Sequence, residues 1–286
     1  MLSNKVGEIM TRDIITADIS SSVFDVMRSM AASDVGRAVI TENGNYAGIF
    51  TEKDVLRRVL SQKLDPKATN IKKVMTTPIR SVPEDTHIIE ALGKMYRSKF
   101  RHLLVRERKG RIVGMVTMRR ILELAVELGE RVSDAQIVGK ILLKQPVKIE
   151  ASEPVRQAID AMIKTDTGCV VITSGGELKG IFTERDLLKR VAVAGLDPDR
   201  TELEKVMTTK LVTLTTSAPV SQVLKEMRSR RFRHMVILDN QGKLAGIVSM
   251  REALKYAKAL DVDESVRSTW KEIEEFWESD EHYTPG

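Results

Sequence analysis

Two segments of the chain place a hydroxyl residue and an acid where an apolar run ends and a helix is expected to begin. Thr51 and Asp54 form a Thr-x-x-Asp pattern, and Thr183 and Asp186 repeat it 132 positions later. In such a pattern the hydroxyl and the acid satisfy free N–H groups of the first helical turn, which predicts a capping box. A carboxylate at a cleft edge can also accept hydrogen bonds from the two hydroxyls of a ribose diol. On the residues alone the capping role is favoured, and the two roles are compatible.

Two further segments depart from this pattern. Thr117 is followed by Arg120, which cannot accept from a sugar hydroxyl but could face a phosphate. Ser249 keeps the hydroxyl, and Glu252 supplies a longer acid that is the more usual capping residue. We therefore expect ligand mainly at the sites of Asp54 and Asp186, and Arg120 marks the least favoured site.

The whole chain repeats over the same distance. Val74-Met75-Thr76-Thr77 returns at 206–209, and Phe100-Arg101-His102 returns at 232–234, again 132 positions later. Within each half a looser repeat appears, because Met10 matches Met75 at an offset of 65. The sequence therefore predicts four units in two tandem pairs and a separate tail, with boundaries at 1–64, 65–130, 131–196, 197–260 and 261–286.

Each unit is predicted to fold in the order β-α-β-β-α. In the first unit, Ile14-Ile15 predicts a strand and Ser20–Ser22 can cap a helix with one apolar face, made of Val23, Val26, Met27 and Met30. Asn43-Gly44 between two apolar runs predicts a hairpin, after which Thr51 opens the second helix. A unit of about sixty residues cannot cover its own sheet, so neighbouring units are expected to pair.

This order and the quoted motifs resemble the CBS domain family, named for cystathionine β-synthase, over roughly residues 6–260. The resemblance implies an α+β fold of four β-α-β-β-α CBS units, which form two tandem pairs with pseudo-twofold symmetry in a disc-like arrangement. It also implies that clefts between paired units bind adenosine-containing ligands such as AMP, ADP, ATP or S-adenosylmethionine. With this resemblance, the ribose role of Asp54 and Asp186 is favoured over a purely structural one.

Basic residues at two predicted strand entries fit the phosphates of such a ligand. Arg101-His102 and Arg233-His234 recur in register, and Arg37 lies near the equivalent place in the first unit. Arginine suits phosphate because its donors form a planar fork. The alternative is a solvated basic edge. The histidines have no cluster of Cys, Asp or further His beside them, so we predict no metal site.

Apolar residues after the unit-opening turns complete the candidate site. Ile79 and Val212 could line an adenine slot, and ordinary core packing is the alternative. The chain has no glycine-rich phosphate loop, nucleophile elbow or Cys-His dyad, so we predict no enzymatic activity. An enzyme that uses S-adenosylmethionine or a nucleotide as substrate would need a catalytic constellation that the sequence does not show.

The net charge of +6 is divided unevenly. Residues 261–286 carry nine acids against Arg267 and Lys271, a net −7, which leaves +13 on the preceding residues. A basic body attracts nucleotides, nucleic acid or an acidic partner. A nucleic-acid-binding regulator is therefore an alternative, although no helix-turn-helix, RRM or zinc motif accompanies the charge.

The acidic tail has tryptophans at helical spacing. Trp270, Ile273 and Trp277 predict an acidic amphipathic helix, which either packs on the basic body or docks on a partner. Charge complementarity favours the first. No apolar run is long enough for a bilayer, and Cys169 is the single cysteine, which excludes an internal disulfide. We expect a cytoplasmic protein without membrane contact.

Together these features predict a non-enzymatic regulatory protein that binds adenine nucleotides between paired units and signals to a protein partner. The signal would be a change in the angle between the two pairs or in the docking of the tail. S-adenosylmethionine is the alternative ligand. The sequence identifies neither the partner nor whether two chains form a homodimer.

Overall fold

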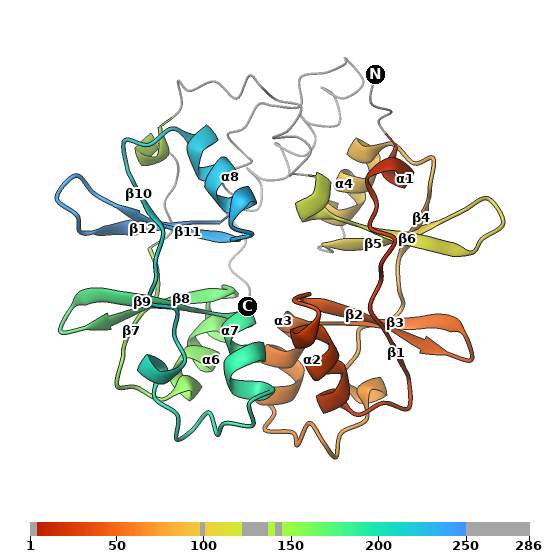
Figure 1. Cartoon of the computed structure of the whole chain (residues 1–286), viewed down its shortest axis with the longest axis horizontal. Helices are drawn as coiled ribbons and strands as arrows, with labels where there is room; N and C mark the ends of the chain where they lie inside the picture. The colour runs from red at the N-terminus through yellow and green to blue at the C-terminus, as the bar shows by residue number, and fades with distance from the viewer. Residues whose placement is uncertain (1–4, 98–100, 122–136, 141–144, 250–286) are drawn as a thin grey trace.

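The computed structural model describes residues 5–97, 101–121, 137–140 and 145–249 of the chain. In these residues four three-stranded sheets lie around a ring, in two pairs that face each other across the centre (Figure 1). Each sheet has its strands in sequence order, with a parallel first pair and an antiparallel second pair. The predicted α+β fold of four similar units in two tandem pairs is confirmed.

The first unit shows how the sequence specifies these elements. Its strands are β1 (Thr16–Asp18), β2 (Arg37–Glu42) and β3 (Asn45–Thr51), and its helices are α2 (Val23–Ala32), α3 (Glu52–Asp54) and the π-helical η1 (Val55–Leu60). The predicted hairpin joins β2 and β3, where Asn43 and Gly44 have φ of 51° and 78°. The first strand begins at Thr16 rather than at Ile14-Ile15, although the Ile15 carbonyl already accepts from the Val39 backbone N–H of β2 at 2.8 Å.

The other units repeat this order. The second contains β4 (Ser81–Pro83), α4 (Ile88–Arg97), β5 (His102–Arg106) and β6 (Ile112–Thr117). The third contains β7 (Lys148–Glu150), α6 (Val155–Lys164), β8 (Cys169–Ser174), β9 (Glu177–Thr183), α7 (Glu184–Asp186) and η4 (Leu187–Ala192). The fourth contains β10 (Thr213–Thr215), α8 (Val220–Ser229), β11 (His234–Leu238) and β12 (Leu244–Ser249). Short connecting helices precede the units: α1 (Val6–Ile9), η2 (Ile71–Lys73), η3 (Val138–Lys140) and η5 (Leu203–Lys205).

The helix α2 follows its predicted pattern. The Ser22 hydroxyl caps it by accepting a hydrogen bond from the Asp25 backbone N–H at 3.1 Å. All four apolar residues of the predicted face are buried: Val23, Val26, Met27 and Met30.

Cys169 is also buried, at the start of β8. None of the helices in the described ranges has the length and apolar character that a bilayer crossing requires.

Apolar layers hold the units together in two ways. Within each pair the two sheets pack face to face, through Val39, Leu104 and Met115 in the first pair and through a cluster around Cys169 and Val236 in the second. Between the pairs, one continuous core contains side chains of both the first and the third unit. In Figure 1 the helices α2, α3, α6 and α7 lie where these units meet. The contact between the first and third units is therefore apolar and buried.

Ion pairs at the edge of this shared core repeat with the same symmetry. Asp166 accepts from Lys53 Nζ at 2.9 Å and from Arg57 Nη2 at 2.5 Å, across the boundary between the first and third units. Its counterpart Asp34, 132 positions earlier, pairs with Lys189 and lies 3.8 Å from Arg185 Nη1. Because these groups are largely exposed, they fix orientation more than they add stability.

We predict that Leu56→Ala destabilises the protein strongly, because its side chain is 1% exposed in the core that both halves share. Loss of a buried leucine side chain costs about 2–5 kcal/mol. Chemical denaturation followed by circular dichroism measures the change. The matched control is Leu64→Ala, since Leu64 is 36% exposed and a surface change costs within about 0.5 kcal/mol. Equal effects of the two changes would contradict the shared core.

Candidate functional site

The candidate site begins at the turn where β3 ends and α3 begins. The Thr51 backbone N–H donates to Asp54 Oδ2 at 2.9 Å, and the Asp54 backbone N–H donates to Thr51 Oγ1 at 3.3 Å. This reciprocal exchange is a capping box, as the spacing predicts. The Thr51 hydroxyl also donates to Asp54 Oδ2 at 2.7 Å. The carboxylate is therefore fixed in one orientation.

The other oxygen of Asp54 reaches the second unit. Thr76 Oγ1 donates to Asp54 Oδ1 at 3.2 Å, and Arg58 Nε lies 3.4 Å from the same oxygen. Arg58 Nη1 also donates to the Met75 carbonyl at 2.8 Å. Burial raises the pKa of Asp54 above its ordinary value, although these donors oppose the shift. Asp54 thus lies where the helical turn of unit one meets the opening segment of unit two.

The second half builds the same turn from the equivalent residues. The Thr183 backbone N–H donates to Asp186 Oδ2 at 3.0 Å, and Thr208 Oγ1 donates to Asp186 Oδ1 at 3.1 Å. Arg190 Nε lies 3.5 Å from Oδ1. Thr76 and Thr208 were not among the predicted site residues, although the repeated Val-Met-Thr-Thr motif contains both.

Two clefts open between the facing sheets of the first pair. One is lined by Thr76, Ile79 and His102 together with apolar residues of β2, β3, β5 and β6. Since Thr76 also donates to Asp54, the carboxylate lies beside this cleft. The free space within this cleft is about 30 Å³, far less than a nucleotide fills, so a nucleotide needs side chains to move apart. Ile79, which the sequence analysis proposes for an adenine slot, lines this cleft.

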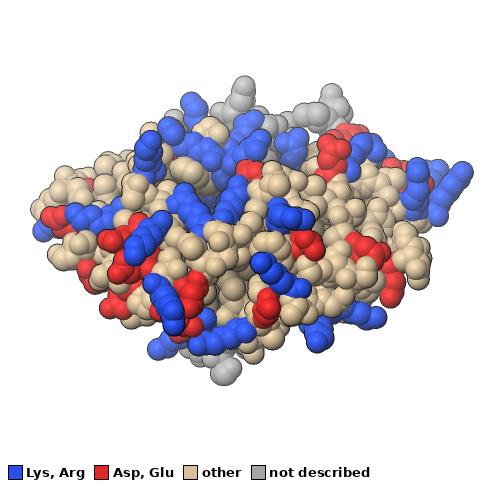
Figure 2. Space-filling model, turned by 60° about the horizontal axis from the view of Figure 1, so that its bottom comes forward, with Lys and Arg blue, Asp and Glu red and all other residues tan. Residues whose placement is uncertain are grey.

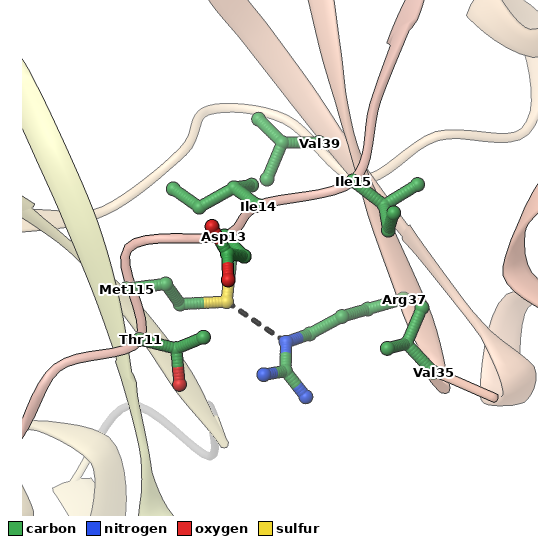
Figure 3. Close-up of a pocket in the computed structure, with 8 residues that line it drawn as sticks. All are labelled: Thr11, Asp13, Ile14, Ile15, Val35, Arg37, Val39 and Met115. Atoms are coloured by element: carbon green, nitrogen blue, oxygen red, sulfur yellow. Dashed lines mark hydrogen bonds between the residues drawn. The ribbon is translucent and has the colours of Figure 1, made fainter. Parts of the chain in front are cut away.

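The other cleft is occupied by Arg37. Its side chain extends from β2 toward Thr11 and Met115, and Nε donates to Met115 Sδ at 2.9 Å (Figure 3). Burial, together with the neighbouring Arg233, lowers the pKa of Arg37 to about 10, which leaves it cationic at neutral pH. A ligand phosphate here would replace a sulfur acceptor with a much stronger one.

The predicted basic pairs converge on the centre of the ring but differ in their contacts. Arg101 is exposed, and the adjacent His102 lines the cleft beside Thr76. Burial, reinforced by Arg37, Arg101 and Arg233, lowers the pKa of His102 well below its ordinary value, so its imidazole is neutral at pH 7. His234 opens β11 and pairs through its backbone with Ser249.

Arg233 is engaged by an acid that the sequence analysis did not single out. Its Nη2 donates to Glu52 Oε2 at 2.6 Å, and Arg185 Nε donates to Glu52 Oε1 at 3.3 Å. The Glu52 side chain is 3% exposed. Burial alone would raise the pKa of Glu52, but Arg233 and Arg185 outweigh it and lower the pKa. A Cβ on Gly36 would lie 2.8 Å from this carboxylate, so a larger residue there would displace Glu52 or Arg233.

The remaining predicted residues are more peripheral. Arg120 donates from its backbone to Thr117 Oγ1 at 3.0 Å and from Nε to the Ile9 carbonyl at 3.4 Å. Val212 packs against the core of the fourth unit, whereas Leu211, which is 132 positions from Ile79, packs between the sheets of the second pair. The repeat offset would have selected Leu211. Glu252 and the tail at 261–286 lie outside the described residues.

A sequence model of the CBS domain matches four segments of the chain: 6–61, 71–127, 138–193 and 203–259. The chain belongs to the CBS domain family. The predicted resemblance is thereby confirmed, with two CBS pairs and clefts between the sheets of the first.

Similar proteins agree with this assignment. The chain is 26% identical over 274 residues to the CBS domain-containing protein CBSCBSPB1 of Arabidopsis thaliana, covering 82% of this chain and 50% of that protein. It is 30% identical over 261 residues to CBSCBSPB2 of the same plant, covering 80% and 48%. The chain thus spans about half the length of these curated relatives.

A solved structure shares the whole arrangement. Protein MJ1225 of Methanocaldococcus jannaschii, described as a candidate archaeal homologue of g-AMPK, superposes with a TM-score of 0.72. The alignment covers 88% of this chain and 99% of that one at 16% sequence identity, which establishes a common fold.

We predict that Glu52→Gln destabilises the protein in a pH-dependent way. The folded-state pKa of Glu52 is lowered from 4.5, so its ion pairs stabilise the fold above pH 4.5 and are lost as the pH falls through the folded pKa. At pH 7 the variant should lose about 1.5–3 kcal/mol of stability, the scale of a hydrogen bond to a charged group. Denaturant titrations at several pH values measure this.

The difference in the free energy of unfolding between wild type and Glu52→Gln should become smaller below pH 4.5. Glu90→Gln is the matched control, because its carboxylate forms an exposed helical pair with Lys94. A difference for Glu52→Gln that is constant between pH 7 and pH 3 would show that the charge of Glu52 does not stabilise the fold.

Proposed function

We propose that this protein is a non-enzymatic regulator that binds an adenine nucleotide in the cleft beside Asp54 and in the equivalent place beside Asp186. The observation that carries the proposal is the bond between Thr76 and Asp54, at 3.2 Å, which places a fixed carboxylate beside a cleft between paired CBS units. Adenosine-containing ligands are the class that the family resemblance implies for such clefts.

The cleft offers a partner for each part of a nucleotide. Asp54 presents Oδ1 to the ribose, because a carboxylate can accept about four hydrogen bonds and its three donors within the protein leave one acceptor position, on Oδ1. Ile79 and Leu104 supply an apolar surface for the base. The phosphates would face the centre, where Arg37, Arg101 and Arg233 gather around His102.

The arginines favour nucleotides over S-adenosylmethionine. Three guanidinium groups near one cleft attract a phosphate chain and repel a sulfonium cation. We propose that Arg101 and Arg233 select for phosphate number, with His102 and His234 beside them and Arg37 contributing from the neighbouring cleft. Arg120 would take part only as a phosphate contact, and Ser249 only as a hydroxyl donor.

The shared core between the first and third units gives ligand binding a route to the other half. A ligand shifts the angle between the pairs only if it binds one arrangement more tightly, and a protein partner that reads the angle completes the signal. Nucleic acid is a weaker candidate partner. Figure 2 shows basic side chains over much of one face, but acidic side chains are interspersed among them.

We predict that Asp54→Asn and Asp186→Asn each weaken nucleotide binding by about 1.5–3 kcal/mol, the scale for hydrogen bonds to a charged group. Asparagine keeps one oxygen for the capping box and loses the anionic acceptor. Isothermal titration calorimetry measures the affinity. Thermal melts without ligand measure how much the capping box contributes to stability.

The matched control is Asp25→Asn. Asp25 also occupies the third position of a helix and bonds its cap hydroxyl, Ser22, at 2.7 Å, but it lines neither cleft. Its replacement should leave affinity unchanged. If Asp54→Asn and Asp25→Asn alter melting equally and neither alters affinity, the carboxylates are helix caps alone.

We predict that Arg101→Gln flattens the preference of wild type for ATP over AMP, while adenosine binding stays nearly intact. A cation near the phosphates rewards each added negative charge, and salt weakens that reward. Titrations of adenosine, AMP and ATP at two salt concentrations measure the effect. Equal affinity of wild type for adenosine and ATP would contradict the assignment, and so would tighter binding of S-adenosylmethionine than of any nucleotide.

A further inference from the structure

The centre of the ring contains two acid–arginine combinations that are equivalent in sequence but not in structure. Glu52 and Glu184 lie 132 positions apart, as do Arg101 and Arg233. Glu52 holds Arg233 at 2.6 Å, so pseudo-twofold symmetry would place Arg101 against Glu184. No hydrogen bond or ion pair joins the Glu184 carboxylate to any residue in the described part of the chain. Glu52 therefore forms an ion pair with its arginine, whereas Glu184 does not.

Both carboxylates are withdrawn from water. Glu52 and Glu184 are 2% and 7% exposed, and each follows the threonine of a Thr-x-x-Asp turn. The side chain at this position points toward the centre, whereas the aspartate two residues later points toward the opening segment of the partner unit. Each turn therefore carries two acids with separate targets. The aspartate faces the proposed ribose position, and the glutamate faces the arginines of the other half.

A nucleotide phosphate and the Glu52 carboxylate require the same donors. The planar fork of an arginine binds either anion through parallel N–H groups, so the two anions compete for Arg233. Arg185 bonds the other oxygen of Glu52 and could keep that carboxylate in place after Arg233 leaves. Loss of the Arg233 contact would remove a direct tie between the first and fourth units, which belong to different halves.

We propose that Glu52 is an internal competitor of the nucleotide phosphates, which holds Arg233 of the opposite half until a phosphate displaces it, whereas its sequence equivalent Glu184 leaves Arg101 available. This inference rests on the proposed function and names the regulation of that site. The first phosphate to arrive meets Arg101, which is exposed and unpaired with Glu184, and Arg233 is reached only after Glu52 yields. Ligand binding in one half thereby breaks the ion pair of Glu52 with Arg233, which joins the two halves.

The test compares Glu52→Gln with Glu184→Gln in the full chain, using ATP and adenosine in calorimetric titrations. Glutamine removes the competing charge, so Glu52→Gln should tighten ATP binding about fivefold or more, the lower end of coupling between sites. Adenosine binding should be unchanged. Glu184→Gln should have a smaller effect, since Glu184 holds no arginine in this structure. Glu90→Gln, which replaces an exposed acid paired with Lys94, should leave the affinity for both ligands unchanged.

A second variant acts in the opposite direction and guards against poor folding of the first. Arg185→Gln leaves Arg233 as the hydrogen-bonding partner of Glu52 among the described residues, so ATP should bind more weakly than to wild type. If wild type binds ATP but Glu52→Gln leaves the ratio of ATP to adenosine affinity unchanged or lower, the competition does not exist and the proposed function stands. If wild type binds no nucleotide, the proposed function itself fails.

Discussion

The hydrogen-bonded turn between β3 and α3 is the constraint on which the rest of the site depends. The exchange between Thr51 and Asp54 begins the helix, and the same carboxylate accepts from Thr76 of the neighbouring unit. Asp54 thus both begins the helix α3 and links the first unit to the second. Its cost of burial is visible in the raised pKa, and a carboxylate kept at that cost is available to a ligand as a strong acceptor.

The same turn also connects the two halves. Between Thr51 and Asp54 the chain turns Glu52 toward the centre, where Arg233 and Arg185 offset the desolvation of its charge. A buried pair of this kind adds little net stability compared with an apolar contact, but removal of one partner is costly. Specificity of arrangement is the more direct consequence. The apolar core shared by the first and third units supplies the stability, and the pair of Glu52 with Arg233 fixes how the fourth unit faces the first.

Much of the fold was predictable because the repeat is exact at its anchors. The 132-residue offset, the Asn43-Gly44 turn and the apolar face of α2 each specify local structure, and all three predictions are confirmed. The residues of the site were harder to predict from the sequence. Ile79 lines the cleft of the first pair, whereas Val212 packs in the core of the fourth unit and Leu211 lies at the repeat equivalent of Ile79.

The central acids were missed for a physical reason. Glu52 and Glu184 fall in the first turn of a helix, where an acid is expected from the helix dipole alone, so sequence gives them no separate signal. The partners of Glu52 come from units more than a hundred residues away, and only the closure of the ring brings them together. For the same reason the sequence could not show that two equivalent acids make different contacts.

The most direct measurement of the central claim changes the ligand and leaves the protein intact. Calorimetric titration of wild type with ATP and with 2′,3′-dideoxy-ATP compares two ligands that share base and phosphates and differ in the ribose diol. If Asp54 and Asp186 hold that diol, the dideoxy ligand should bind at least about tenfold more weakly, since each hydrogen bond to a charged group contributes about 1.5–3 kcal/mol. Equal affinities would show that the carboxylates do not hold the ribose and would contradict the account.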